Sequence, residues 1–306
     1  MRSPLNYAGG KSKLSKVIVP MIPRDHICYC EPFCGGAWVL FSKEPSKDEV
    51  INDMDNELVC FWRVIQHHLA TFLDCFKHAV ISRQLWEWEK MKNPDTLTDI
   101  HRAVRYFYLQ RLSFGGKTHK RTFGTSATGP LNLNLATMEE TLIEVNWRLR
   151  KVAVEHLDAL DCIRRYDRPT TFFYIDPPYF FNQHDYAVSF SRFEDLALLL
   201  GRVKGRFILS LNDCAEVRKI FKAFTQRRVT LTYSAGNSRT AAGTRGEPRH
   251  ELLIHNLGPA RGRKPAREVP EACTGPKTFS TRCKGGGSRR KPSQLAIAAA
   301  EAGESS

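Results

Sequence analysis

Long apolar runs are missing from this chain. No stretch of 18 consecutive apolar residues occurs, and the most apolar segment near the C-terminus, "QLAIAAAEA", is far too short to cross a bilayer. The first residues, "MRSPLNYAGGK", contain no apolar signal core. We therefore expect a soluble protein of the cytoplasm with no membrane partner.

Cysteine patterns typical of disulfide frameworks or zinc sites are also missing. The nine cysteines are odd in number, and no CxxC pair is matched by a second pair. Cys28, Cys30 and Cys34 cluster where the sequence indicates a buried strand, and small apolar packing is the common role of cysteine there. We expect reduced thiols and no metal site.

The glycine signatures of the common nucleotide folds are incomplete. The segment "EPFCGG" has only Gly35 and Gly36 where a dinucleotide site has GxGxxG, which argues against a dinucleotide oxidoreductase. The segment "NYAGGKSKL" lacks the spacing and the preceding strand of a P-loop. A ligand with an adenosine but no pyrophosphate fits these absences, although a plain strand-to-helix turn is the alternative at Gly35 and Gly36.

Acidic residues are missing from residues 101–138, which contain six Lys and Arg. The whole chain has a formal net charge of +14, so a polyanionic partner is expected. Part of this charge lies in residues 259–306, with ten Lys and Arg against four Asp and Glu. Because residues 258–306 are rich in Pro, Gly, Ser and basic residues, we expect them to form a disordered basic tail.

Strand and helix patterns alternate along the rest of the chain. Strands are predicted at "ICYC", "DEVIN", "TTFFYID", "GRFILSLN", "RRVTLTYSA" and "HELLIHN", with helical spacing between them and a long helical stretch from residue 57 to about 108. Alternation of this kind indicates an α/β fold with a largely parallel sheet. The last two strands are close enough in sequence to form an antiparallel edge pair.

The segment "DPPY" directly follows the strand pattern that ends at Ile175. A primary aromatic amine is a poor nucleophile until acceptors draw its hydrogens and free its lone pair. Asp176 supplies one acceptor and the Pro177 carbonyl a second, because the Pro178 ring fixes the local backbone. Tyr179 offers a face for stacking a planar base. The alternative is a proline-rich turn with a solvated carboxylate.

Two further positions point toward the same ligand. Asp53 comes at the tip of the second strand, where a carboxylate can accept hydrogen bonds from two ribose hydroxyls. The alternative is helix capping by Asn52, Asp53 or Asp55. Tyr7 and Lys11 flank two glycines in an N-terminal segment that can fold over a ligand.

In this order, the four motifs resemble the Dam-like D12 class of DNA adenine N6-methyltransferases, α group. The quoted segments "YAGGK", "EPFCGG", Asp53 and "DPPY" carry the resemblance, and "RLSFGGKTHKRTFG", "FSRFEDLALLL" and "GEPRHELLIHN" extend it over about residues 3–257. The resemblance implies a Rossmann-like methyltransferase sheet with a helical target-recognition insert. It assigns residues 1–56 and 150–257 to a catalytic domain and residues 57–149 to the insert, which includes a basic hairpin or loop.

The resemblance also implies a cofactor and a reaction. The cofactor is S-adenosyl-L-methionine, and the positions that match its binding residues are Tyr7, Lys11, Phe33, Gly35, Gly36, Asp53 and Asp176. The catalytic positions are Asp176, Pro177, Pro178 and Tyr179. The reaction is site-specific N6-methylation of an adenine flipped out of double-stranded DNA.

DNA contacts are expected from the basic and amide residues of the insert. These candidates are Arg111, Lys117, Lys120, Arg121, Asn132 and Asn134. The segment "GGKTHK" differs from GATC-reading versions, so GATC is only one candidate target. The family implies a monomer in a prokaryotic or phage setting, and a cognate restriction nuclease, a phage origin or a solitary role are left open.

Rival functions come from other classes. A methylase fold that only binds DNA has no need of "DPPY", Asp53 and Lys11 together. RNA, cytosine N4 and protein amides are other acceptors for a related fold. Ser usually stands in place of Asp176 in cytosine-N4 enzymes and Asn in protein-amide enzymes, so the acid argues against these two acceptors.

Overall fold

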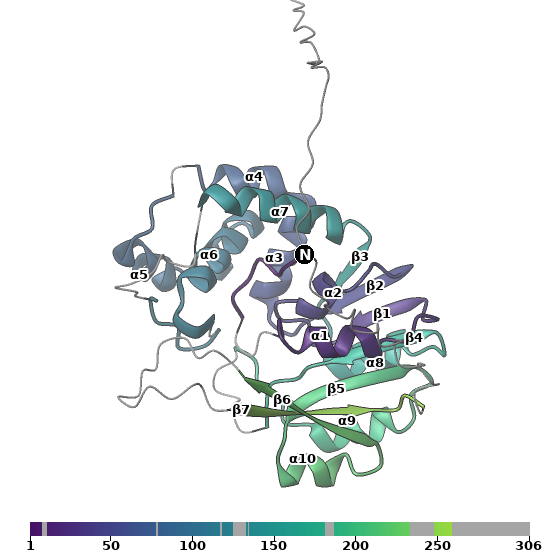
Figure 1. Ribbon diagram of the computed structural model, residues 1–306. Coiled ribbons are helices and arrows are strands. Elements are labelled where there is room, and N and C mark those ends of the chain that lie inside the picture. Colours follow the sequence, from purple (N-terminus) through teal and green to yellow (C-terminus); the bar gives the residue numbers. More distant parts are fainter. Residues whose placement is uncertain are drawn as a thin grey trace, which may run out of the picture. The chain divides into compact units, whose positions relative to one another are not determined.

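A seven-stranded mixed sheet organises the part of the chain that the structure describes (Figure 1). The structure is a computed structural model, and it describes residues 1–7, 11–77, 79–116, 118–124, 133, 135–180, 187–232 and 248–258. The strand order is β3-β2-β1-β4-β5-β7-β6. The strands are β1 (Cys28–Glu31), β2 (Asp48–Asn52), β3 (Val152–Glu155), β4 (Thr171–Ile175), β5 (Arg206–Asn212), β6 (Thr225–Thr232) and β7 (Pro248–His255).

The strands from β3 to β5 run parallel to one another, and β7 runs antiparallel to both of its neighbours. The predicted α/β class and the antiparallel pair of final strands are therefore confirmed. Strand β3 was not predicted from the sequence. It contains only four residues and lies at an edge of the sheet, so its apolar alternation is short.

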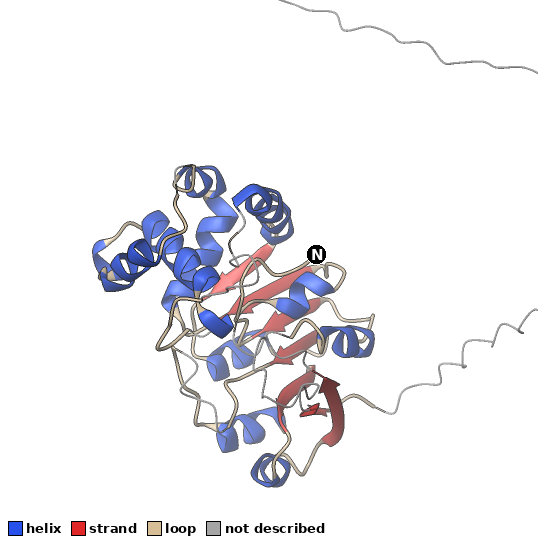
Figure 2. Ribbon diagram, turned by 60° about the vertical axis from the view of Figure 1, so that its left-hand side comes forward, coloured by secondary structure: helices blue, strands red, loops and turns tan. Residues whose placement is uncertain are grey.

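Helices cover both faces of the sheet (Figure 2). Along β4, Phe172 and Tyr174 belong to one apolar core, whereas Phe173 and Ile175 belong to another on the opposite face. Alternation along an extended strand places the side chains on these two faces. The helices are α1 (Ser15–Ile18), α2 (Trp38–Ser42), α3 (Asn56–His67), α4 (Leu69–Asp74), α5 (Arg83–Met91), α6 (Asp99–Leu112), α7 (Leu135–Leu149), α8 (Ala159–Tyr166), α9 (Phe193–Leu200) and α10 (Ala215–Ile220).

Helices α3 to α7 pack against one another, as Figure 1 shows. Their aromatic centre includes Phe61, Phe72 and Phe107, with the Phe61 and Phe107 rings stacked at 5.5 Å between centroids. This block corresponds to the proposed insert, whose boundaries stay a prediction. The proposed tail lies outside the described residues from 259 onward. Among the described residues, no helix combines the length and apolarity needed to span a membrane.

The connections around β1 and β4 create the place for a ligand. The chain passes from β1 to β2 on one side, and from β4 to β5 on the other. In open α/β sheets, the crevice at the carboxyl ends of such a strand pair is the usual ligand site. The Phe33–Gly36 turn follows β1 and Asp176 follows β4, so the topology brings these two motifs together at the carboxyl ends of the parallel strands.

Candidate active site

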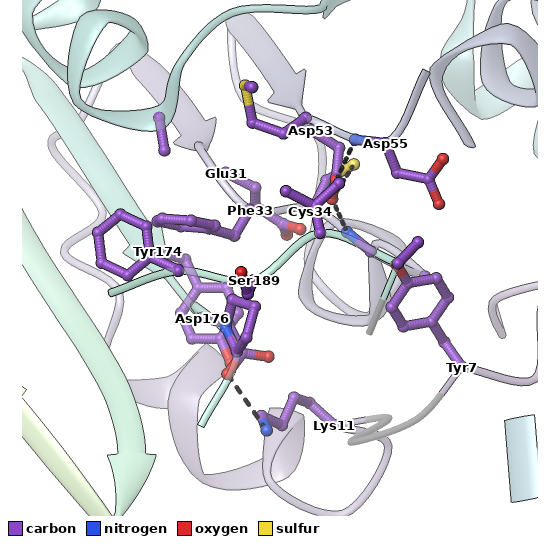
Figure 3. Close-up of a pocket in the computed structure, with 18 of the residues that line it drawn as sticks. Tyr7, Lys11, Glu31, Phe33, Cys34, Asp53, Asp55, Tyr174, Asp176 and Ser189 are labelled. Carbon is purple, nitrogen blue, oxygen red and sulfur yellow. Dashed lines mark hydrogen bonds and ion pairs between the residues drawn. The ribbon is translucent and has the colours of Figure 1, made fainter. Parts of the chain in front are cut away.

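A pocket of about 270 Å³ lies at the carboxyl ends of the parallel strands (Figure 3). It is lined by all of the positions predicted to bind a cofactor, namely Tyr7, Lys11, Phe33, Gly35, Gly36, Asp53 and Asp176. Pro178 also lines it. The N-terminal segment, the turn after β1 and the ends of β2 and β4 therefore converge as the sequence predicts, although no ligand role follows from the convergence alone.

Asp176 lies at the centre of a polar network. Its Oδ1 atom is 3.2 Å from the Lys11 Nζ atom and accepts a hydrogen bond from Ser210 at 2.8 Å. The Ser210 hydroxyl is also 3.0 Å from the Tyr174 hydroxyl. Burial raises the pKa of Asp176 to about 6, against the opposing effects of Lys11 and Ser210. At pH 7 this carboxyl is therefore mostly ionised and fixed in place.

Tyr179 is held by its hydroxyl group. It donates to the Glu251 carboxylate, with distances of 2.6 and 2.7 Å to the two oxygens, and accepts a hydrogen bond from Lys11 at 2.5 Å. The Lys11 ammonium also lies 4.4 Å from the centre of the Tyr179 ring. These contacts fix the tyrosine ring beside Asp176, and Lys11 joins the two halves of the "DPPY" segment.

Asp53 closes the glycine turn. Its Oδ2 atom accepts from the Gly35 amide at 3.0 Å, and its Oδ1 atom accepts from the Asp55 amide at 3.0 Å. Asp55, rather than Asp53, caps helix α3 by accepting from the amides of Glu57 and Leu58. The structure thus settles the capping alternative and leaves Asp53 facing the pocket (Figure 3). Burial raises the pKa of Asp53 to about 6.

Gly35 has a positive φ angle of +46°, and a Cβ atom added there would lie 3.0 Å from the Tyr7 ring. We expect Gly35→Ala to lower the free energy of unfolding by ~1–2 kcal/mol, since an L-residue in this conformation is strained. Gly201→Ala is the control, because Gly201 has φ −66° and an added Cβ would be in ordinary contact. Urea unfolding of both variants measures the difference, and equal stability would contradict the strained turn.

Glu31 is another acid of the pocket, and its side chain is buried. Its Oε1 atom accepts from the Tyr29 hydroxyl and from the Leu40 amide, both at 2.7 Å. Burial raises the pKa of Glu31 to about 8, so it is mostly neutral at pH 7. A neutral amide can therefore replace it with little loss of hydrogen bonding.

We expect Glu31→Gln to change the free energy of unfolding by less than about 1 kcal/mol near pH 4, where the folded wild type carries a neutral glutamate, whereas Glu31→Ala leaves two buried donors unpaired at ~1–3 kcal/mol each. The raised pKa of Glu31 in the folded state means that the wild type loses stability as pH rises from about 4.3, the usual glutamate value, to about 8. Urea unfolding at pH 5 and pH 8 should show that the free energy of unfolding of Glu31→Gln increases relative to that of the wild type at the higher pH. An unchanged difference would contradict the assignment.

Another part of the pocket lining, residues 187–192, comes from the segment before α9. Phe190 packs edge-on against Phe33 at 5.0 Å between ring centroids. Asp158 caps α8 and forms an ion pair with Arg192. Asp158, Ser210 and Glu251 are site residues that were not predicted from the sequence. Glu251 directly precedes the apolar run of residues 252–254 in β7, and a buried acid at such a position is a usable signal.

Three of the residues predicted to contact DNA, Arg111, Lys120 and Arg121, lie among the described residues. The Arg111 guanidinium donates to the Pro4 carbonyl at 3.1 Å, and burial lowers its pKa. The Arg121 guanidinium lies 5.0 Å from the Tyr106 ring centre and lowers the pKa of Asp55 against the larger, opposing effect of burial. Lys120 is exposed. Lys117, Asn132 and Asn134 lie outside the described residues.

Comparison with known proteins adds to this geometry. Residues 7–234 match the model of the D12 class N6 adenine-specific DNA methyltransferase family. The chain is similar to the Type II methyltransferase M.CviBI of Paramecium bursaria Chlorella virus NC1A, with 24% identity over 76% of this chain and 91% of that protein. It is also similar to the Type II methyltransferase M1.LlaDCHI of Lactococcus lactis subsp. cremoris, with 20% identity over 84% and 96%. A DNA N-6-adenine-methyltransferase of Escherichia phage P1 is 27% identical over 42% of this chain and 17% of that protein.

Proposed function

Because the chain belongs to the D12 class N6 adenine-specific DNA methyltransferase family, we propose that it transfers a methyl group from S-adenosyl-L-methionine to N6 of an adenine flipped out of double-stranded DNA. The observation that carries the proposal is the position of Asp176, a fixed acceptor in a pocket at the carboxyl end of β4.

The pocket has the chemistry that this cofactor requires. S-adenosyl-L-methionine supplies an electrophilic methyl group on a sulfonium that leaves as a neutral thioether. Its cationic groups suit a pocket lined by Asp53 and Asp176, which are mostly ionised at pH 7. Asp53 retains lone pairs for the ribose hydroxyls after accepting two amide hydrogens, since a carboxylate has about four acceptor sites. Phe33 supplies an apolar face.

The protein's part in the reaction is to hold and polarise the amine. The Asp176 carboxylate accepts one hydrogen of N6 and the Pro177 carbonyl accepts the other, which frees the nitrogen lone pair for in-line attack on the methyl group. The Tyr179 ring stacks on the adenine. The carbon–nitrogen bond forms as the sulfur–carbon bond breaks, and the amine then loses one proton to solvent.

Adenine N6 reaches this pocket only after the base leaves the duplex, at a cost of a few kcal/mol. Phosphate contacts by basic residues of the insert, including the exposed Lys120, offset that cost and make binding steeply dependent on salt. We assign target reading to the segment from 115 to 134 and leave the target sequence open. The proposed enzyme acts as a monomer.

The direct test is to incubate the protein with unmethylated duplex DNA and S-adenosyl-L-methionine labelled in the methyl group. The DNA is then digested and its nucleosides are separated. Label in N6-methyladenine is the expected result. Label in N4-methylcytosine, or label only in RNA or protein acceptors supplied in parallel, would contradict the proposal.

A further inference from the structure

Gln110 joins two segments that the proposed function uses separately. It lies on α6 with no exposed surface, and its side-chain amide donates to the Asn6 carbonyl at 2.5 Å and to the Gly116 carbonyl at 2.7 Å. Asn6 precedes Tyr7, which lines the cofactor pocket. Gly116 ends the short helix Phe114–Gly116, at the start of the segment to which we assign target reading.

The packing at this junction leaves little freedom. Gly116 has φ +67°, and a Cβ atom there would lie 3.0 Å from the main chain of Asn6 and Tyr7. Arg111, next to Gln110, donates to the Pro4 carbonyl of the same N-terminal segment. A displacement of the turn at Gly116 must therefore displace the segment that carries Tyr7.

A residue shortly after this turn also contacts the pocket lining. The Ala187 amide donates to the Thr118 hydroxyl at 2.9 Å, and Ala187 lines the pocket. Gly116 is thus linked through Gln110 to the segment that carries Tyr7, and Thr118 is bonded to Ala187. A change in this part of the chain on DNA binding would therefore shift both the segment that carries Tyr7 and the segment at Ala187.

Gln110 is also held at an energetic cost. Both carbonyls require the NH₂ group of its amide, so the Oε1 atom must point away from them, and this buried atom has no hydrogen-bond partner among the described residues. A buried acceptor without a partner is unfavourable because it loses its hydrogen bonds to water and gains none in the protein. An apolar side chain would avoid that cost, so the two donated bonds are the feature that the glutamine provides.

We propose that Gln110 is a positioning residue that couples binding of the DNA target to binding of the methyl donor. The inference rests on the proposed function. When the duplex fixes the turn at Gly116, the Gln110 amide fixes Asn6 and therefore Tyr7 in the arrangement that binds the donor. Linkage requires the donor to strengthen DNA binding by the same factor.

The test compares Gln110→Leu with Gln66→Leu. Gln66 is a matched control because its amide also donates to two main-chain carbonyls, those of Leu149 and Val152, at 2.7 and 2.9 Å. The affinity for S-adenosylhomocysteine, which cannot transfer a methyl group, is measured by calorimetry with and without a duplex that the wild type methylates. The thermal midpoint of each variant is measured in parallel.

We expect the duplex to tighten binding in the wild type by about fivefold or more, in the usual range of coupling. The ratio of the affinities for S-adenosylhomocysteine with and without duplex should be unchanged in Gln66→Leu. In Gln110→Leu this ratio should fall to about two or less, at a thermal midpoint similar to that of the control. If Gln110→Leu does not fold, Gln110→Asn carries the comparison, because its shorter side chain cannot reach both carbonyls.

A ratio in Gln110→Leu equal to that of the control would overturn the inference, as would a ratio of one in an active wild type. Either result leaves the proposed methyl transfer standing. A wild type that neither binds S-adenosylhomocysteine nor methylates DNA would overturn the proposed function and this inference with it.

Discussion

Asp176→Ala is expected to lower the rate constant of methyl transfer by ~10³-fold or more, since the variant loses a preorganised acceptor for the reacting amine. The acceptor is fixed in the wild type by Ser210 and Lys11. The measurement is a single turnover with enzyme, labelled donor and duplex DNA, at a donor concentration that saturates each variant.

Asp176→Asn is the control that keeps the size of the side chain and removes its charge. The amide keeps one oxygen acceptor but loses the charge that faces Lys11, so we expect a rate between those of the wild type and Asp176→Ala. Affinity for DNA, measured by fluorescence anisotropy, should change by less than about threefold in both variants because most of that affinity comes from phosphate contacts, which a carboxylate does not make. A rate for Asp176→Ala within tenfold of the wild type would remove this residue from the reaction.

Lys11→Met is expected to reduce methyl transfer at pH 7 by ~10²-fold, the usual scale for loss of one preorganised polar group. The ammonium is buried, with only 4% of its side chain exposed, and it contacts both Asp176 and Tyr179. Its removal leaves Asp176 without its cation and frees the Tyr179 hydroxyl on one side. Lys11→Arg keeps the charge and should retain more of the rate.

The pH profile separates a charge effect from a general loss of structure. Burial raises the pKa of Asp176 to about 6 while Lys11 opposes that rise. The ionised form is the acceptor, so the wild-type rate should increase with pH through about 6 and then level off. In Lys11→Met the pKa of Asp176 rises further, and the midpoint of the profile should move to higher pH. A lowered rate with an unmoved midpoint would show that Lys11 acts in some other way.

Much of the site could be predicted because its residues directly follow strong strand patterns. The "DPPY" segment comes after five consecutive buried residues of β4, and Asp53 comes directly after β2. Parallel strands then bring both acids to one edge of the sheet. Ser210 and Glu251 could not be placed in this way, because they lie inside β5 and β7 and reach Asp176 and Tyr179 only through the pairing of distant strands.

Arg111 illustrates a different limit of sequence reasoning. An arginine in a segment without acids looks available for phosphate, but the structure directs its guanidinium to the Pro4 carbonyl, 107 residues away in the chain. Periodicity along α6 indicates which side chains face the core, but not that an N-terminal segment will cover one of them. Its predicted contact with DNA therefore stays untested and has a structural competitor.

The central claim is that the carboxyl end of β4 receives an adenine flipped out of the duplex. The most direct test measures affinity for duplexes in which the base opposite the mapped target adenine is replaced by a mismatch. Weakening the target pair lowers the cost of flipping, so binding should tighten by about tenfold, whereas the same mismatch two pairs outside the recognition sequence should not tighten it. Equal affinity for the matched duplex and the duplex mismatched at the target would contradict the claim.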